Sequence, residues 1–391
     1  MLSEQEARDR IVRAVSPRPE RTVLLLESVG CFSARNVVAR VPLPTFDNSA
    51  MDGYAVVASS SRKRARLKVI GEQPAGIDRQ LLIAHDQAVR IFTGAPIPAG
   101  ANAVVMQEET MREGDAVVLK VDVDPGDFIR RRGCDLAEGQ KILGRGERIR
   151  PVTIALLASQ GFADVTIGGQ VNVAIVSTGD EIVMPGTRLD QGQIYDSNLT
   201  LLQALVRQSG ACVISAEHCP DQRERLIEAI QRGMKSHILV VTGGVSVGEH
   251  DLVQATLRSL EAKIDVWRVA IKPGKPFLFG QAGGCVAFGL PGNPVSAFVT
   301  FLQFVRPAIL KMMGANDLDL PKTQVRLTVD LANDGDRTHY MRGRIDKGTF
   351  MPIGRQESHA LFGLSQSNAL LRVAVGEELK AGATVDVQTW D

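Results

Sequence analysis

Cysteine, histidine and net charge are all scarce in this sequence, and each scarcity argues against a class of protein. The five cysteines are odd in number, scattered and without a CxxC pair, which argues against both a disulfide framework and a zinc site. The six histidines show no metal-ligand spacing. The formal net charge is only +1, which gives no general attraction for nucleic acid or for a membrane surface.

Long apolar runs and a leader-like N-terminus are missing as well. No apolar run approaches the roughly 20 residues that a bilayer span needs. The first residues, MLSEQEARDRIVRAV, are charged and helix-like, so they do not resemble a secretory signal. We therefore expect a soluble cytoplasmic protein with no nucleic-acid or membrane partner, whose chemistry uses carboxylates, lysines and backbone amides.

What the chain does have is the length and composition of an ordinary multidomain protein. Its 391 residues are 44% apolar and 23% charged, and roughly 150 residues per domain suggests two to four domains. Residues 1–30 favour a helical start broken by prolines, and residues 41–123 are short β-rich segments separated by Gly and Pro. The segment PVTIALLASQ, from Pro151, predicts a short helix closed by Gly161.

Residues 171–314 alternate between strand and helix patterns. VNVAIVS, ACVISAE and HILVVTGG are apolar runs suited to buried strands. The segment SNLTLLQALVRQSG predicts a helix capped by Ser197 or Asn198, and a second helix is expected to begin near Asp221. Such alternation predicts an α/β fold with a mainly parallel sheet. Residues 321–391 return to β-like alternation and suggest a small terminal barrel.

Each strand end in the α/β region is followed by polar side chains or by glycines. In open α/β sheets, ligands bind in the crevice beyond the carboxyl ends of the strands. We therefore expect one site there, built from Asp180, Glu181, Asp221, Gly243, Gly244, Ser246, Gly248, Asp251, Lys272, Lys275, Pro291, Gly292, Asn293, Pro294 and Ser296.

The residue types at these strand ends indicate phosphate chemistry. Glycine-rich turns that lead into helices, as in TGGVSVG and PGNPVS, present free N–H groups and a positive dipole end to anions. Lys272 and Lys275 can neutralise phosphate oxygens. The carboxylates would repel a bare phosphate, so they imply either Mg²⁺ or a proton-transfer role. Each motif alone is also typical of a surface turn, and only their co-occurrence favours a site.

Four other features carry alternatives. His250 suits an acid–base role, but a single histidine is more often a solvated loop residue. The run Arg130–Arg132 is equally consistent with an anion-binding site and with a solvent-facing surface. Cys134 has no basic histidine placed beside it by the sequence, so a thiol nucleophile is disfavoured. The stretch TFDNSAMDGYAV, residues 45–56, fits neither a helical nor a strand period and holds more polar residues than a turn needs.

Seven longer motifs occur in one order along the chain: FDNSAMDGYAV, RIFTGAPIPAGANAVVMQEE, IRRRGCDL, IVSTGDEIV, TGGVSVGEHD, IKPGKPFLFG and GLPGNPVSAF. Together they resemble the MoeA family of molybdopterin molybdenumtransferases, whose eukaryotic counterpart is the gephyrin E domain. The resemblance covers nearly the full chain and is weakest beyond Pro321, where SHALFGLSQSNAL is the matching segment. Two segments depart from the family pattern, namely GEHD with its His250, and GRQESH.

The resemblance implies an elongated L-shaped subunit of a homodimer, with a three-layer, MogA/MoaB-like α/β domain, flanking β-rich domains and a C-terminal β-barrel. The expected domains are 1–44 with 136–170 (connecting and dimerisation, with the first helix free to pack on the α/β domain), 45–135 (β-rich), 171–318 (molybdopterin-binding) and 319–391 (barrel). The active site would lie between the α/β domain of one subunit and the β-rich domain of the other. There, TFDNSAMDGYAV would form a wall whose polar residues face the cleft and need not satisfy their own domain.

The resemblance also implies the activity, which is insertion of molybdate into adenylated molybdopterin with release of AMP and Mg²⁺ as the metal. Partners would include an adenylating MogA-like protein and cofactor-accepting enzymes, both in transient contact. In this hypothesis the two lysines and the Gly243–Ser246 and Gly292–Ser296 loops hold phosphate and molybdate. The metal would be held, or the attacking oxygen polarised, by Glu181, Asp221 and Asp251. The family's functional positions fall on Asp52, Thr93, Asp135, Glu181, Asp221, Asp251, Lys272 and Lys275, with Asp52 and Asp135 closing the site from the partner subunit.

Two other functions stay open. One is a non-catalytic pterin-binding or scaffold protein, because a fold does not fix a function. The other is an enzyme that uses the same anion-binding edge on another phosphoanhydride. The number of carboxylates retained beside an anion site argues against the scaffold, because binding alone does not need them.

Overall fold

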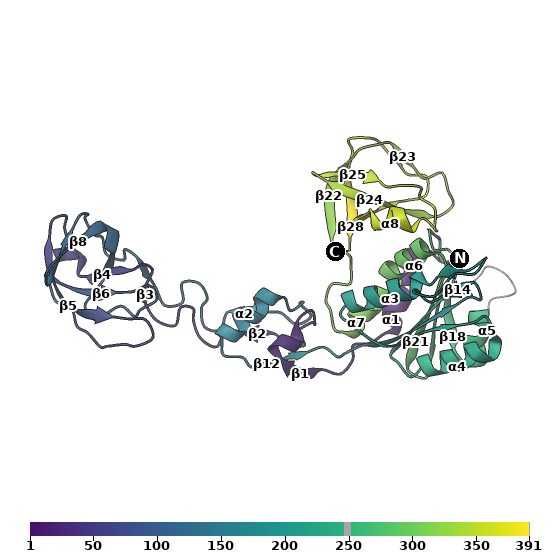
Figure 1. Cartoon of the computed structure of the whole chain (residues 1–391), viewed down its shortest axis with the longest axis horizontal. Helices are drawn as coiled ribbons and strands as arrows, with labels where there is room; N and C mark the ends of the chain where they lie inside the picture. The colour runs from purple at the N-terminus through teal and green to yellow at the C-terminus, as the bar shows by residue number, and fades with distance from the viewer. Residues whose placement is uncertain (246–251, 391) are drawn as a thin grey trace. The chain divides into compact units, whose positions relative to one another are not determined.

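The computed structural model describes residues 1–245 and 252–390. The chain forms two compact units (Figure 1), of which unit 1 comprises Met1–Arg35, Arg145–Pro151 and Asp164–Asp391. Unit 2 comprises Asn36–Gly144 and Val152–Ala163. The finer division into four domains stays a prediction.

The centre of unit 1 is a six-stranded sheet in the order β16-β13-β17-β21-β20-β18. Its parallel strands are β13 (Asn172–Thr178), β16 (Cys212–Cys219), β17 (Ile238–Thr242) and β21 (Cys285–Leu290). The other two, β18 (Lys263–Trp267) and β20 (Leu278–Ala282), pair antiparallel at one edge. The prediction of a mainly parallel sheet is confirmed, and its apolar strands are buried because helices cover both faces.

Successive residues of β13 face two different apolar cores, as the alternation of a strand requires. Val173 and Ile175 pack with α1 (Glu4–Ala14), α3 (Ser197–Gln208), α6 (Pro294–Thr300) and α7 (Arg306–Met312). Ala174 and Val176 pack with α4 (Arg223–Gly233) and α5 (Leu252–Ser259) on the opposite face. This gives the three-layer α/β arrangement that Figure 1 shows around β21.

Two helix starts differ from the prediction. The N-cap of α3 is Asp196, whose carboxylate accepts from the Leu199 amide at 2.8 Å, and neither Ser197 nor Asn198 fills that position. An aspartate caps as well as serine or asparagine, so three adjacent candidates could not be separated by type. Helix α4 starts at Arg223, two residues later than expected.

One long helix passes through the core of unit 1. It consists of α6, a π-helical turn η4 (Phe301–Val305) and α7, and it runs from Pro294 to Met312 without a break. By length and composition its 19 residues could cross a membrane, so the expectation that no such run exists was too strict. However, 89% of its most apolar stretch is buried inside the protein, which is the pattern of a core helix.

The C-terminal part of unit 1 is a closed five-strand barrel, as predicted. Its strands pair in the circular order β22 (Lys322–Leu327), β25 (Thr349–Pro352), β24 (Thr338–Asp346), β26 (Ala369–Val373) and β28 (Thr384–Thr389), and β28 returns to β22. The short strand β19 (Ile271–Lys272) adds to the edge of β24. This pairing brings the KPGKP loop of the α/β region against the barrel. The barrel region also holds α8 (Leu361–Ser365) and the pair β23 (Leu331–Ala332) and β27 (Glu378–Leu379).

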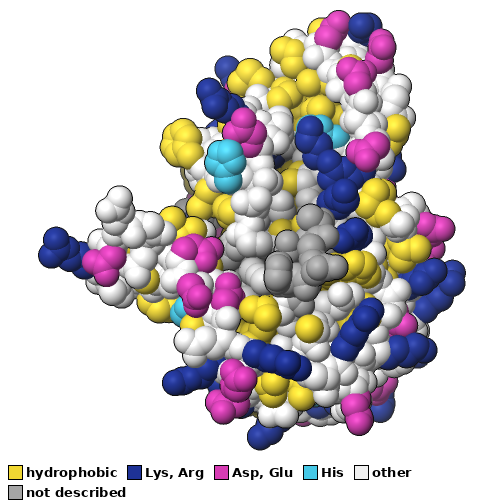
Figure 2. All heavy atoms as spheres, turned by 90° about the vertical axis from the view of Figure 1, so that its right-hand side faces the viewer, with side chains coloured by type: hydrophobic (Ala, Val, Ile, Leu, Met, Phe, Trp, Pro, Cys, Tyr) yellow, Lys and Arg dark blue, Asp and Glu magenta, His cyan; other side chains and the backbone are white. Residues whose placement is uncertain are grey.

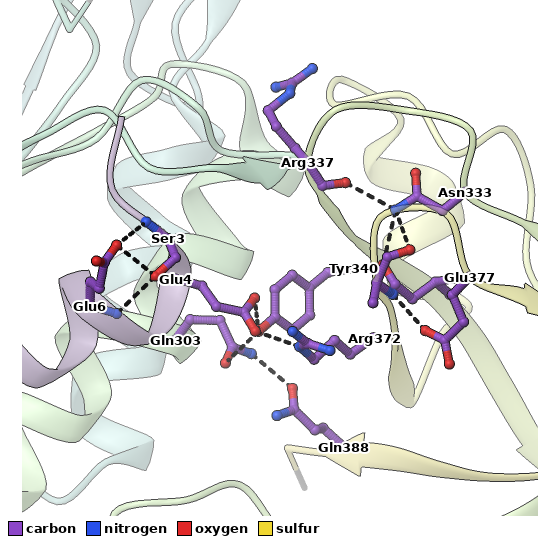
Figure 3. A network of polar contacts seen from close by, with 12 residues as sticks. Ser3, Glu4, Glu6, Gln303, Asn333, Arg337, Tyr340, Arg372, Glu377 and Gln388 are labelled. Carbon is purple, nitrogen blue, oxygen red and sulfur yellow. Dashed lines mark hydrogen bonds and ion pairs between the residues drawn. The ribbon is translucent and has the colours of Figure 1, made fainter.

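Helix α1 is bonded to the barrel through its first turn (Figure 3). Ser3 and Glu6 form a capping box, in which the Glu6 amide donates to Ser3 Oγ at 3.2 Å. The hydroxyl of Tyr340, on β24, donates to the Glu4 carboxylate at 2.9 Å, and Arg372 donates to the same carboxylate. The start of the chain therefore stabilises the position of the barrel.

Two small pairs of strands complete the described strands of unit 1. The pairs in unit 1 are β1 (Arg21–Leu24) with β12 (Asp164–Ile167), and β14 (Ile182–Val183) with β15 (Ile194–Tyr195); the 3-10 turn η1 (Leu25–Ser28) follows β1.

Unit 2 has a six-stranded sheet of its own, with the order β7-β4-β6-β5-β9-β8. These strands are β4 (Gly53–Val56), β5 (Arg66–Gln73), β6 (Gln87–Ile91), β7 (Ala103–Met106), β8 (Thr110–Glu113) and β9 (Ala116–Leu119).

Shorter elements fill the rest of unit 2. They are the pairs β2 (Val37–Val38) with β11 (Lys141–Leu143) and β3 (Asn48–Ser49) with β10 (Ile129–Arg130), and the 3-10 turns η2 (Ala58–Ser60) and η3 (Gln107–Glu109). Helix α2 (Pro151–Ser159) follows, and Gly161 beyond it has a φ of +74°. The predicted β-rich region and the predicted short helix closed by glycine are both present.

Candidate functional site

Two strand ends at the carboxyl edge of the α/β sheet bring carboxylates together. Thr178 ends β13, and its hydroxyl donates to the Asp221 carboxylate at 2.5 Å. The backbone amide of Asp221 donates in turn to Asp180 Oδ1 at 3.0 Å. The loops after β13 and β16 are therefore bonded to each other through Asp180 and Asp221, and the N-cap of α4 is Gln222.

The turns after β17 and β21 approach each other closely. Gly243 has a φ of +86°, and a Cβ atom there would lie 2.1 Å from the Thr178 carbonyl oxygen, so only glycine fits. A Cβ atom on Gly292 would lie 3.7 Å from Gly243 Cα. Asn198, on α3, joins the two turns, because its Nδ2 donates to Thr242 Oγ1 at 3.1 Å and to the Gly292 carbonyl at 2.7 Å. The two turns are thus fixed against each other, with Gly243 buried and Gly292 exposed.

Gly244 continues the same turn with a φ of +61°. Its missing side chain matters less than that of Gly243, since a Cβ atom would meet only methyl groups, at 2.9 and 3.0 Å.

A pocket of about 600 Å³ opens next to the turn after β21. The α/β region and the barrel both line it, with Lys272, Pro273, Gly274, Lys275, Pro276, Pro291, Asn293, Ser296, Arg337, Gln356, Glu357, Ser358 and His359. Figure 2 shows dark-blue Lys and Arg side chains gathered between the barrel, at the top, and the sheet below it. The pocket contains both predicted lysines and three of the five residues predicted from PGNPVS.

Positive charge dominates this pocket. Lys272 is exposed, and Lys275 and Arg337 are half-buried. Arg337 Nε pairs with the Asp336 carboxylate at 3.1 Å, and its Nη1 donates to a backbone carbonyl at 3.3 Å. The Glu357 carboxylate lies 3.2 Å from His359 Nε2, within the pocket wall itself. Behind Lys272, burial and the neighbouring cations lower the pKa of His339 to about 4, so that ring is neutral at pH 7. Three flexible or forked cations facing one cavity suit an oxyanion.

Ser358 joins the barrel wall of the pocket to the start of α6. Asn293 Nδ2 donates to Ser358 Oγ at 2.9 Å, and the Val295 amide donates to the Ser358 carbonyl at 3.1 Å. The Val295 amide is therefore used within the protein, and Pro294 has no N–H to offer. An anion at this helix start would therefore meet side chains more than the free amides that the sequence suggested.

Sequence reasoning missed Arg337 and Ser358 as pocket residues. Arg337 lies in the unremarkable segment DGDRTHY, and Ser358 is the first residue of SHALFGLSQSNAL. The one signal for Ser358 was that this segment carries the resemblance beyond Pro321. For Arg337 no local signal exists, because its position in the pocket depends on the pairing of β19 with β24.

In unit 2, Asp52 and Thr93 form a close pair. Asp52 Oδ1 accepts hydrogen bonds from the amide and the hydroxyl of Thr93, both at 2.7 Å. These bonds hold the pKa of Asp52 below its usual value, the amide contributing most. Asp52 therefore stays ionised well below pH 7.

The polar stretch at residues 45–56 mostly satisfies its own unit. Asp47 accepts from the Arg132 amide at 2.8 Å and from Arg131 Nη1 at 2.7 Å, and these bonds lower its pKa. Asn48 and Ser49 are buried. Ser49 Oγ donates to the Met51 carbonyl, whereas Asn48 Oδ1 is buried with no hydrogen-bond partner among the described residues. The expectation that these side chains face a cleft and need not satisfy their own domain is therefore wrong for Asp47 and Ser49, and Asn48 does not contradict it. It stays a prediction for Asp52.

The other predicted residues of unit 2 lie at its surface. Asp135 and Cys134 are exposed, and the Asp135 amide donates to the Leu43 carbonyl at 3.0 Å. Within the arginine triplet, Arg131 pairs with Asp47, and Arg132 lies 3.8 Å from the Glu138 carboxylate. Two of the three arginines thus have carboxylate partners within their own unit.

Four predicted residues, Ser246, Gly248, His250 and Asp251, lie outside the described residues. Across 1–245 and 252–390, no group of three or more His, Cys, Asp or Glu side chains is placed to hold a metal ion. Glu181 is exposed, and its carboxylate lies over the Gly179 backbone. Asp180 and Asp221 lie in neighbouring loops, and their carboxylates are hard oxygen ligands of the type that Mg²⁺ prefers, so the donor chemistry fits magnesium.

Comparison with known proteins matches the chain to three family models. Residues 2–161 match the MoeA N-terminal region (domain I and II), residues 174–311 match a probable molybdopterin binding domain, and residues 324–390 match the MoeA C-terminal region (domain IV). Together the models span nearly all of the sequence, including both described units.

Full-length relatives and solved structures are similar as well. The molybdopterin molybdenumtransferase of Haemophilus influenzae is 36% identical over 402 residues, covering 100% of this chain and 99% of the relative. Molybdopterin molybdenumtransferase 2 of Mycobacterium tuberculosis is 34% identical, covering 100% of both chains. A crystal structure of the molybdopterin biosynthesis MoeA protein of Pyrococcus horikoshii superposes with a TM-score of 0.83 at 29% identity, again covering 100% of both chains.

Proposed function

Because this chain belongs to the MoeA family of molybdopterin molybdenumtransferases, we propose that it inserts molybdate into adenylated molybdopterin and releases AMP. A transferase role in molybdenum cofactor biosynthesis follows from the named relatives. The adenylated substrate and the release of AMP are the proposed part. The observation that supports them best is the cationic pocket of Lys272, Lys275 and Arg337 beside glycine turns that a phosphate can approach.

The pocket suits molybdate in charge and in size. Molybdate is a tetrahedral dianion, and Lys275 and Arg337 donate N–H groups that match its oxygens. The hydroxyl of Ser358 adds a neutral donor from the barrel side. The pocket volume of about 600 Å³ falls within the range of roughly 300–1,000 Å³ typical of small-ligand sites, so part of the pterin substrate fits beside the oxyanion.

The carboxylate edge of the sheet serves the phosphate end of the substrate. Gly243, Gly244 and Gly292 let the backbone approach the phosphates, and Glu181, Asp221 and Asp251 would hold Mg²⁺ among them. When bound, the metal neutralises phosphate oxygens as the pyrophosphate link opens. Asp221 is already oriented for this by Thr178.

We further propose that the protein works as a homodimer in which Asp52, Thr93 and Asp135 complete the partner's site. The bonds from Thr93 keep Asp52 ionised and fixed in orientation, as a residue aimed at a metal or a proton would need. An adenylating MogA-like protein would supply the substrate, and cofactor-accepting enzymes would take the product.

The test is molybdate-dependent AMP release from adenylated molybdopterin by the purified chain. Lys275→Met and Arg337→Met should each raise the KM for molybdate about tenfold or more, since each removes a charged contact to the oxyanion. Lys263→Met, an exposed lysine of β18, is the matched control and should leave the KM unchanged. No AMP release by the wild type would favour a scaffold, and turnover of a simple nucleotide without pterin would favour another phosphoanhydride enzyme.

Shared sites have their own test. Asp52→Ala and Lys275→Ala chains, each impaired alone, should regain part of the lost activity when mixed, because a heterodimer holds one intact site. Absence of complementation in a verified heterodimer would refute sharing but not the activity itself.

A further inference from the structure

Arg342, on β24, is a buried cation that no part of the proposed chemistry uses. It is 1% exposed and is among the largest fully buried side chains of the protein. Its guanidinium reaches backbone carbonyls only: Nη1 donates to Glu357 O at 3.3 Å, and Nη2 donates to Arg355 O. The Glu357 carboxylate pairs with His359 instead, at 3.2 Å. Glu357 attracts the charge of Arg342 without a hydrogen bond to it. A buried charge whose hydrogen bonds all go to neutral carbonyls is costly, so a specific use for it is expected.

The two carbonyls that Arg342 binds belong to the segment that forms the barrel wall of the cationic pocket. Gln356, Glu357, Ser358 and His359 all line that pocket. Gln356 makes a second attachment, because its Oε1 accepts from the Arg342 amide at 3.0 Å and its Nε2 donates to the Arg342 carbonyl at 2.9 Å. The side chain of Arg342 therefore binds the backbone of residues 355 and 357, and the backbone of Arg342 binds the side chain of Gln356.

The same wall is attached on its other side to the α/β region. The Val295 amide and Asn293 Nδ2 both donate to Ser358, at 3.1 and 2.9 Å. The wall is therefore fixed between β24 and the start of α6. A wall fixed at both sides presents its donors without reorganisation when a ligand binds.

The charge of Arg342 acts in addition to its hydrogen bonds. Carbonyl dipoles neutralise a guanidinium less completely than a carboxylate does, and burial keeps water from screening the remainder. Burial first of all lowers the pKa of His339, and the positive charges of Lys272, Arg342 and Arg337 lower it further, to about 4.

We propose that Arg342 is a positioning residue for the oxyanion: it holds the 355–358 wall in place and adds positive potential to the pocket without touching the ligand. This rests on the proposed function, which places molybdate in that pocket. The class of ligand concerned is a small tetrahedral dianion.

The experiment measures the Kd for inorganic molybdate on the full-length chain by calorimetry. Arg342→Met should weaken binding about tenfold or more, equivalent to about 1.4 kcal/mol. The control is Arg344→Met, which removes the same charge from the same strand at an exposed position and should change the Kd less than about twofold. Arg342→Lys keeps the charge but cannot bind both carbonyls, so it should recover only part of the loss.

Two further measurements keep the result interpretable. In turnover, Arg342→Met should raise the KM for molybdate while leaving the KM for the pterin substrate unchanged, whereas a general loss of structure would change both. If Arg342→Met does not fold, Gln356→Met decides, because it removes the second attachment without leaving a charge unpaired. A folded variant of either kind with the wild-type Kd overturns the inference. If Arg337→Met also leaves the Kd unchanged, the pocket is not the oxyanion site and the proposed function of the pocket fails with it.

Discussion

The close approach of Gly243 to the end of β13 gives the sharpest structural prediction. Gly243 has a φ of +86°, and a Cβ atom there would lie 2.1 Å from the Thr178 carbonyl oxygen. Gly284, in the hairpin between β20 and β21, has almost the same φ of +88°, but a Cβ atom there would meet nothing within 4 Å. An alanine would meet the same unfavourable backbone conformation at either position, but only at position 243 would its Cβ atom collide with a backbone atom. Gly284→Ala is therefore the matched control.

The magnitudes separate the two variants. An alanine at positive φ costs about 1 kcal/mol or somewhat more, and Gly284→Ala should show only this. Gly243→Ala must also move the turn by about 1 Å away from a backbone atom, which adds roughly 1–3 kcal/mol of the kind seen on overpacking. We therefore expect about 2–4 kcal/mol for Gly243→Ala.

Thermal melting and turnover check this prediction together. The Tm of Gly243→Ala should fall below that of Gly284→Ala by on the order of 5 °C. Because the Gly243 turn contacts Gly292, the KM for the pterin substrate should rise in Gly243→Ala and stay at the wild-type value in Gly284→Ala. Equal melting temperatures and equal KM values in the two variants would refute the close approach.

Three other variants test separate parts of the structure. The pKa of His339 is about 4, so between about pH 6.5 and 4 the unfolded chain binds one more proton at this residue than the folded chain does. The free energy of unfolding should therefore fall with falling pH, by up to about 1.4 kcal/mol per pH unit from this group. His339→Gln should lose that slope in urea unfolding measured at several pH values. Tyr340→Phe removes the bond to Glu4 at 2.9 Å and should lower stability by about 1 kcal/mol, whereas an unchanged Tm would mean that the bond contributes nothing. Asp52→Asn keeps the shape but loses the charge held by Thr93, so kcat for AMP release should fall about tenfold or more at a nearly unchanged Tm, and wild-type turnover would remove Asp52 from the mechanism.

Much of the fold could be predicted because its local signals agree with its packing. The strands β13, β17 and β21 are buried on both faces, and such strands are continuous apolar runs in the sequence. Helix α2 begins at a proline and is followed by a glycine at positive φ, as the sequence indicated. The errors in helix starts arose where adjacent residues have similar capping ability, as at Asp196 and Ser197.

The candidate site could be predicted only where its residues follow strands of the same sheet. Lys272 and Lys275 belong to a recognisable loop, and the structure places both in the pocket. Arg337 and Ser358 reach that pocket through the pairing of Lys272 with His339 and through the bonds from α6, and no period or spacing encodes such contacts. The polar stretch around Asp47 was misinterpreted for the same reason, because its partner Arg131 is 84 residues away.

Crystals of the full chain grown with molybdate, with diffraction recorded at the molybdenum absorption edge, test the central claim most directly. We expect an anomalous peak within hydrogen-bonding reach of Lys275, Arg337 and Ser358. A peak bound only elsewhere, or no peak in that pocket at saturating molybdate, would contradict it.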